Sequence, residues 1–116
     1  MSHIKEGVAA LAGRSCKAMQ VKVTRLEDGQ IREYLSVLDG WTLEGEAIAR
    51  TYAFKNYYET IAFVNATAWI SHREDHHPDL EVGYNKCTIR YSTHSVGGLS
   101  ENDFICAAKI SVLAAE

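Results

Sequence analysis

The chain has 116 residues, and its apolar share of 47% and charged share of 23% are those of a single globular domain rather than a disordered or fibrous protein. Its formal net charge is −3, and no apolar run approaches the roughly 20 residues that a membrane-spanning helix needs, so we expect no membrane segment. Three cysteines without a C-x-x-C spacing indicate free thiols in a reducing compartment, and we therefore expect a cytoplasmic protein.

The first 24 residues are predicted to be a basic leader or extension, followed by one domain over residues 25–116. Residues 1–25 carry five basic side chains and one acidic one, a local balance of +4 that leaves −7 on the rest of the chain. The segment contains no aromatic side chain on which a nucleic-acid base could stack. We therefore expect it to pack along the domain and to make no direct contact with nucleic acid.

The first half of the domain is predicted to hold a helix, a strand pair and a longer helix. Residues 28–39 have apolar side chains at helical spacing, with Asp28 as the N-cap and Gly40 as the stop. Residues 41–54 favour two strands about a tight turn near Gly45. The longest helical pattern covers residues 56–72, and the face expected to cover the sheet comprises Tyr57, Ile61, Val64 and Ala68, widened by Tyr58, Ala62 and Trp69.

The second half is predicted to add another strand pair and a final helix. Residues 86–92 alternate, with Cys87, Ile89 and Tyr91 on one side of the strand. The last helix opens with a capping box in which Ser100 is the cap and Asp103 follows three residues later. The order α-β-β-α-β-β-α predicts an α+β fold, a four-stranded antiparallel sheet covered on one face by three helices. Because the other face would stay uncovered, we expect an oligomer.

Histidines gather on either side of the second strand pair. His76 and His77 precede the only proline, which ends the helix before them, and His94 closes the last strand. An imidazole titrates near neutral pH, and Asp75 beside the pair can orient a ring or favour its charged form. Spacing alone leaves three interpretations open: acid–base chemistry on a small polar substrate, a metal site formed by His72, His76 and His94, or ordinary surface histidines.

The stretch EDHHPDLEVGYNKCTIRYSTHSVGGLSENDF closely resembles the signature of the pterin-4a-carbinolamine dehydratase family. The family pattern combines a His-His-Pro, an aromatic residue, a His at the end of an S-T-H strand and an Asp in the final helix. With the Gly-Trp pair at residues 40–41 and the helix after it, the resemblance covers residues 31–108, about two-thirds of the chain. The matching positions of the signature are His76, His77, Pro78, Tyr84, His94 and Asp103.

The resemblance implies the fold expected above and assembly into homodimers or homotetramers. It implies dehydration of 4a-hydroxytetrahydrobiopterin to quinonoid dihydrobiopterin, with no metal and no organic cofactor. This reaction regenerates the pterin used by aromatic amino acid hydroxylases, so a phenylalanine hydroxylase is an implied pathway partner. The family also includes dimerisation cofactors of a transcription factor, and a pterin-binding or regulatory protein with little dehydratase activity is the alternative.

The resemblance also implies roles for individual residues. His76 and His94 are the expected proton-transfer groups, His77 is expected to contact the pterin, and Asp103 is either catalytic or only the capping-box partner. His72 stands where animal members of the family often have Glu, and this departure favours the regulatory alternative unless Glu74 supplies the carboxylate. His72 and Glu74 are therefore candidates for an auxiliary role in the site. The expected pterin pocket comprises Asp75, His76, His77, Ser92, Thr93, His94 and Ser95.

Overall fold

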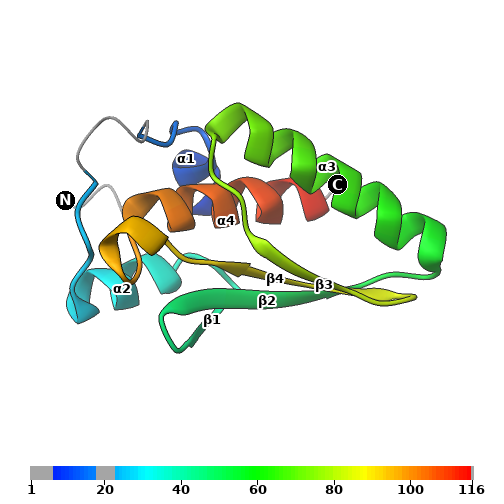
Figure 1. The fold of residues 1–116 in the computed structure, drawn as a ribbon, viewed down its shortest axis with the longest axis horizontal. Helices are drawn as coiled ribbons and strands as arrows, with labels where there is room; N and C mark the ends of the chain where they lie inside the picture. Colours follow the sequence, from blue (N-terminus) through cyan, green and yellow to red (C-terminus); the bar gives the residue numbers. More distant parts are fainter. Residues whose placement is uncertain (1–6, 18–22, 116) are drawn as a thin grey trace.

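A computed structural model describes residues 7–17 and 23–115 of the chain. It confirms the predicted α+β architecture, a four-stranded antiparallel sheet with helices in the predicted order (Figure 1). One short helix, α1, precedes that order and lies within the segment predicted as a leader. The elements are α1 (Val8–Ala12), α2 (Asp28–Leu35), β1 (Thr42–Glu44), β2 (Ala47–Ala53), α3 (Tyr57–Glu74), β3 (Asp79–Val82), β4 (Lys86–Tyr91), the 3-10 helix η2 (His94–Val96) and α4 (Glu101–Ala114).

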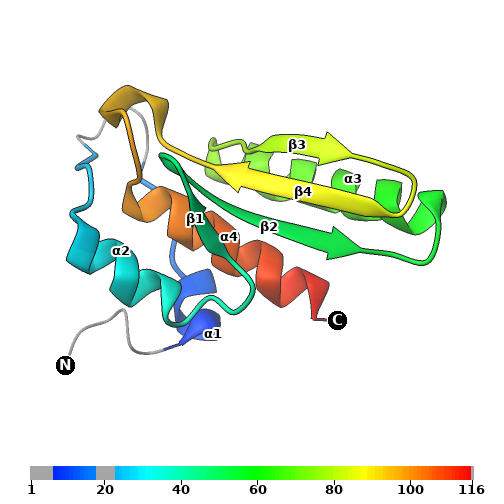
Figure 2. The same ribbon diagram turned by 90° about the horizontal axis from the view of Figure 1, so that it is seen from below.

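The sheet has the strand order β1-β2-β4-β3, and every neighbouring pair is antiparallel. The central pair, β2 with β4, runs from Ile48 opposite Tyr91 to Ala53 opposite Lys86. The long helices α3 and α4 lie on one face of the sheet, and the view from below shows the other face open among the described residues (Figure 2). No helix in this part of the chain combines the length and apolar character needed to cross a membrane.

The core lies between the central strands and α4. Cys87, Ile89 and Tyr91 of β4 are buried on the helix side, which confirms the alternation predicted for this strand. α4 is buried over the continuous run from Asn102 to Ala108, so this part of the helix is covered on all sides. Because each large apolar side chain contributes roughly 1.5–3 kcal/mol when it leaves water, this layer fixes the end of β4 against the start of α4.

The shorter helices pack onto α4. Leu11 of α1 belongs to the buried core, and the Lys109 ammonium donates to the carbonyl oxygen of Ala12 at 2.7 Å. Tyr34 of α2 stacks on Phe104 of α4, with ring centroids 4.7 Å apart. Residues 8–12 of the segment predicted as a leader therefore share the core of the domain.

The N-cap predicted for α2 is wrong by one residue. Glu27, not Asp28, has the extended backbone of a cap, and it forms a capping box with Gln30, whose side-chain oxygen accepts the Glu27 amide at 3.0 Å. Asp28 is the first helical residue, where the positive end of the helix dipole stabilises its negative charge. The longer Glu side chain reaches the third helical amide, so it takes the role assigned to Asp28.

The buried face predicted for α3 is right at Val64, which is half-buried against the core, and wrong at most of its other positions. The helix buries Thr60, Phe63 and Thr67, whereas Tyr58 and Trp69 are 81% and 61% exposed. The two threonines tolerate burial because their hydroxyls donate to backbone carbonyls. The Thr60 hydroxyl is within hydrogen-bond distance of the carbonyls of Asn56 and Tyr84. The Thr67 hydroxyl donates to the carbonyl of Val64. The helix is therefore rotated relative to its apolar pattern, and it presents aromatic side chains outward.

Candidate active site

The loop between α3 and β3 carries the first two histidines. Asp75 caps α3 in the left-handed conformation (φ 50°, ψ 43°), and the amides of Asp75 and His76 donate to the carbonyls of His72 and Ser71. Pro78 follows, and it disfavours helical geometry at the preceding residue. The helix therefore ends where the sequence predicted, and the chain brings His76 and His77 beside the end of β4.

The loop between β4 and α4 carries the third histidine. A backbone bridge joins Thr93 to Gly98, whose carbonyl accepts the Thr93 amide at 2.8 Å. Between them η2 makes a tight turn that ends at Gly97 with a φ of 65°, a conformation favourable to glycine. The turn buries the Thr93 side chain against α4 and leaves His94 exposed.

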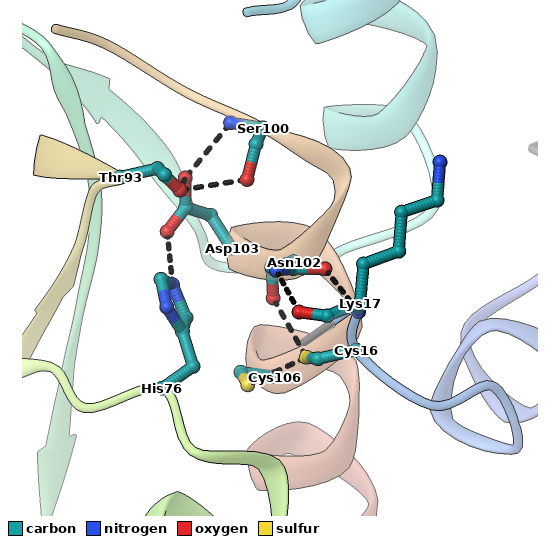
Figure 3. A network of polar contacts seen from close by, with 8 residues as sticks. All are labelled: Cys16, Lys17, His76, Thr93, Ser100, Asn102, Asp103 and Cys106. Carbon is teal, nitrogen blue, oxygen red and sulfur yellow. Dashed lines mark hydrogen bonds and ion pairs between the residues drawn. The ribbon is translucent and has the colours of Figure 1, made fainter. Parts of the chain in front are cut away.

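A buried polar network joins the two loops through α4 (Figure 3). The Nε2 atom of His76 lies 2.6 Å from Oδ1 of Asp103, which is fully buried in the first turn of α4. The other carboxylate oxygen, Oδ2, accepts hydrogen bonds from the Thr93 hydroxyl at 2.8 Å and the Ser100 amide at 2.9 Å. The carboxylate therefore has three partners, and it acts at once as the capping-box acceptor and as the partner of His76.

The tautomer of His76 is assigned from this network. Because an ionised carboxylate can only accept hydrogen bonds, we assign the hydrogen of the 2.6 Å contact to Nε2. In the neutral ring, Nδ1 then holds a lone pair and can take a proton from a bound molecule. In the protonated ring, the buried Asp103 carboxylate balances the charge. The arrangement suits a group that alternates between the two states.

Tyr91 forms the wall behind His76. The two rings stack with centroids 5.7 Å apart and an interplanar angle of 11°. The Tyr91 hydroxyl is buried and has no hydrogen-bond partner among the residues that the structure describes. Burial, and then the neighbouring Cys106 thiol, raise the pKa of Tyr91 above its ordinary value. The stack holds the imidazole in one plane, a role that the sequence pattern did not indicate because it showed Tyr91 only as a core residue.

An open pocket of about 460 Å³ lies in front of His76. This volume is within the range of small-molecule sites. His77 and His94 are exposed on its rim, while His76 is only 9% exposed. All seven residues expected to bind substrate lie together here, and Asp79 and Arg90 join them; the lining is Asp75, His76, His77, Asp79, Arg90, Ser92, Thr93, His94 and Ser95.

Asp79 and Arg90 line the pocket although no sequence pattern indicated them. They are opposite each other in the pairing of β3 with β4, so the strand register brings both to the rim. Arg90 donates to Glu44 at 2.7 Å and to Glu81 at 3.0 Å, and these hydrogen bonds raise the pKa of its guanidinium. Alternation along β4 had indicated that Arg90 faces away from the core, but only the register of β3 shows its neighbours.

The auxiliary candidates lie elsewhere. His72 is exposed on the last turn of α3, and neither it nor Glu74 lines the pocket. The Glu74 carboxylate accepts the Cys16 amide at 2.9 Å and lies 3.8 Å from the Lys109 ammonium, so it ties the leader to α3 and α4. Within residues 7–17 and 23–115, no cluster of three or more His, Cys, Asp or Glu side chains has an arrangement that could hold a metal ion.

Comparison with known proteins identifies the family. The family model described as pterin 4 alpha carbinolamine dehydratase matches residues 24–113, which include both histidine loops and nearly all of α4. The chain belongs to this family. The resemblance found in the histidine signature is thereby confirmed, and the name of the family describes a hydro-lyase, an enzyme that removes water.

Bacterial relatives match over most of their length. A protein of Nitrosospira multiformis, provisionally named a pterin-4-alpha-carbinolamine dehydratase, is 57% identical over 103 residues, which cover 89% of this chain and 91% of that protein. A protein of Bdellovibrio bacteriovorus with the same provisional name is 65% identical over 89 residues, covering 73% of this chain and 74% of its own. The similarity therefore extends well beyond the signature.

Two solved structures share the fold. A transcriptional coactivator/pterin dehydratase from Brucella melitensis superimposes with a TM-score of 0.75 at 34% identity, over 78% of this chain and 99% of its own. A pterin dehydratase-like protein described as a RuBisCO assembly factor in the alpha-carboxysome superimposes with a TM-score of 0.54 at 25% identity, over 66% and 88% of the two chains. These two proteins are described with different roles on the same fold, so function has to be argued from the site.

Proposed function

We propose that this family member dehydrates 4a-hydroxytetrahydrobiopterin to quinonoid dihydrobiopterin by histidine acid–base catalysis. The observation that carries the proposal is the buried 2.6 Å hydrogen bond between His76 and Asp103, at the wall of a pocket that His77 and His94 also line. The names of the family and of its bacterial members support the same reaction.

The reaction requires two proton transfers. The 4a-hydroxyl leaves as water only after it receives a proton, and the quinonoid product forms only when a ring N–H loses one. His76 is the proposed base, because Asp103 occupies its Nε2 and leaves Nδ1 as the acceptor. His94, on the other loop, is the proposed acid, and His77 binds the pterin. One proton enters and one leaves the substrate, so no metal or organic cofactor is needed.

The remaining pocket residues suit the polar edge of a pterin. Asp75 and Asp79 offer carboxylates to N–H donors, and the Ser92 and Ser95 hydroxyls can donate or accept. Thr93 is buried and already donates to Asp103, so we assign it to holding the carboxylate as well as to the pocket wall. A few polar groups around a concave surface are typical of sites that orient a small ligand.

The direct test is the decay of enzymically generated carbinolamine with and without the purified protein. We expect the wild-type protein to accelerate the decay over the spontaneous reaction. His94→Gln should lose about 10²–10⁴-fold in kcat, the usual contribution of an acid–base group. Thermal denaturation of each variant verifies that the fold is intact. A spontaneous rate unchanged by the folded wild-type protein would refute the enzymatic proposal.

We also propose that the protein assembles as a homodimer or homotetramer. β3 is an edge strand of the sheet, and Leu80 and Val82 on it are exposed. Tyr58 and Trp69 are exposed on α3. Unpaired edges and exposed apolar side chains are features that proteins normally cover. Light scattering coupled to size exclusion would give the mass of the assembly, and a monomer at micromolar concentration would contradict it.

A second candidate function is pterin binding or regulation without turnover. The exposed aromatic face of α3 favours it, because such a surface can receive another protein. The two solved structures, described as a transcriptional coactivator/pterin dehydratase and as a RuBisCO assembly factor, support the same candidate. Saturable binding of a pterin without acceleration of carbinolamine decay would establish this candidate and exclude the first.

The proposed setting follows from the reaction. A dehydratase of this kind supplies the pterin cycle of an aromatic amino acid hydroxylase, and we propose such an enzyme as its pathway partner. Cys16, Cys87 and Cys106 are all free thiols, which agrees with the cytoplasm as the proposed compartment. The proposed domain begins at residue 25, with residues 1–24 as an extension that contributes α1 to the core.

A further inference from the structure

Two free thiols lie in contact beneath the active site. The Sγ atoms of Cys16 and Cys106 are 3.4 Å apart, although the residues are separated by 90 positions in the sequence. Cys106 belongs to α4, one turn after Asp103, and Cys16 belongs to the segment that follows α1 (Figure 3). The third cysteine, Cys87, is buried in β4.

The backbone on both sides of Cys16 is held in place. Its amide donates to Glu74 at 2.9 Å, and the next amide, that of Lys17, donates to the side-chain oxygen of Asn102 at 3.0 Å. The Asn102 side-chain nitrogen returns a hydrogen bond to the Lys17 carbonyl at 3.1 Å. Because Asn102 is four residues before Cys106 on α4, these contacts align the two sulfur atoms without any covalent link.

We propose that Cys16 and Cys106 form an oxidation site, at which a hydroperoxide converts the two thiols into a disulfide that ties the leader to α4. The proposal is independent of the proposed dehydratase activity. The contact of 3.4 Å leaves the sulfurs a small movement from bonding distance, which is about 2.05 Å. No comparable contact exists for Cys87 among the described residues.

The chemistry divides the two roles by exposure. Cys16 is half-buried and Cys106 is fully buried, so the peroxide reaches Cys16 first. The hydrogen bond with Cys16, and then burial, raise the pKa of Cys106, which therefore keeps its proton beside the Cys16 sulfur. The Cys16 thiolate attacks the peroxide, an S–O bond forms, the O–O bond breaks, and the hydroxide that leaves becomes water with the proton that Cys16 gave up. The Cys106 sulfur then attacks the sulfenic sulfur, an S–S bond forms, the S–O bond breaks, and the Cys106 proton leaves with the hydroxyl as the second water. Two thiols and one hydrogen peroxide thus give one disulfide and two waters.

The consequence is a covalent tether in place of a set of hydrogen bonds. A disulfide that closes so long a loop restricts the unfolded chain, and we expect the thermal midpoint to rise by roughly 10 °C. Because α4 also carries Asp103, the tether fixes residues 7–17 to the helix that holds the active-site carboxylate. Oxidation therefore stabilises the attachment of the leader.

The test treats the full chain with hydrogen peroxide and measures intact mass, free thiols and the disulfide-linked peptide. Wild type is expected to lose two hydrogen atoms, to fall from three free thiols to one, and to yield a peptide joining Cys16 to Cys106. Its thermal midpoint should rise by roughly 10 °C and return after dithiothreitol. Cys87→Ala, which also removes one thiol, is the matched control and should form the same link.

Cys16→Ser should abolish the link and the thermal shift. We choose this variant because Cys16 is half-buried, whereas a substitution of the fully buried Cys106 could prevent folding. Three free thiols remaining after peroxide would overturn the proposal. So would oxygen added to Cys16 without a crosslink, or a link that includes Cys87. A crosslinked protein with an unchanged thermal midpoint would overturn the stabilising tether.

Discussion

Asp103→Asn is the substitution whose outcome the site geometry specifies most closely. The asparagine carbonyl can keep the hydrogen bonds that Oδ2 accepts from the Thr93 hydroxyl and the Ser100 amide. Its NH₂ group then faces His76 Nε2, where Oδ1 lay at 2.6 Å. Two donors cannot face each other, so His76 must move its hydrogen to Nδ1. The proposed base would then present a donor to the substrate.

The magnitudes separate activity from stability. Two of the three hydrogen bonds survive in neutral form, and the third keeps His76 as its partner but reverses direction, with the amide NH₂ donating to Nε2. The free energy of unfolding should therefore fall by only about 1–2 kcal/mol. The wrong tautomer should reduce kcat by about 10²–10⁴-fold, the range of a lost acid–base group. A loss of that size in a folded protein separates the two roles of Asp103, because the capping box is retained.

The assay combines the initial rate of carbinolamine dehydration with thermal denaturation and ¹⁵N NMR of the His76 ring, which reports the tautomer. Glu101→Gln is the matched control. It neutralises a carboxylate two residues earlier on α4, where the partly buried Glu101 pairs with Arg14 at 3.1 Å and Lys17 at 3.2 Å. An Asp103→Asn protein that retains the wild-type rate would refute the reasoning, as would an equal loss in Glu101→Gln.

Because burial raises the pKa of Tyr91, the folded state loses stability as pH rises above the ordinary phenol pKa of 10.0. Tyr91→Phe should lose less stability than wild type over this pH range. Thermal midpoints measured from pH 8 to 11 test this, and equal losses in the two proteins would contradict it. Tyr91→Leu removes the ring that stacks on His76 and should lower kcat about 10-fold, which corresponds to roughly 1.4 kcal/mol of lost positioning. Tyr91→Phe keeps the ring and should retain the wild-type rate. Equal rates in both variants would show that the stack has no role. Trp69→Lys places a charge on the exposed face of α3 and should weaken the assembly in sedimentation velocity, with exposed Lys86→Ala as a control; an unchanged assembly would place the interface elsewhere.

The strands and the position of the histidines were predictable because short-range patterns determine them. Alternation of Cys87, Ile89 and Tyr91 marks the buried side of β4, and Pro78 marks the end of the preceding helix. The role of Asp103 was left as a choice between cap and catalytic group. The structure supports both contacts, because each carboxylate oxygen serves a different partner.

Features that depend on distant neighbours were not predictable. The rotation of α3 depends on Thr60 and Thr67, which a hydrophobicity pattern counts as polar. Both can be buried because their hydroxyls donate to backbone carbonyls. The stack of Tyr91 on His76 joins residues from different elements. The contact of Cys16 with Cys106 spans most of the chain, and no local spacing indicates it.

In the proposed mechanism, His76, His77 and His94 surround the ring of a pterin while Asp103 orients His76. A crystal structure with the unreactive analogue 7,8-dihydrobiopterin tests it most directly. We expect the pterin ring in the pocket, within hydrogen-bond reach of His76 and in contact with His77 and His94. An analogue bound elsewhere, or a pocket that stays empty at saturating ligand, would contradict it.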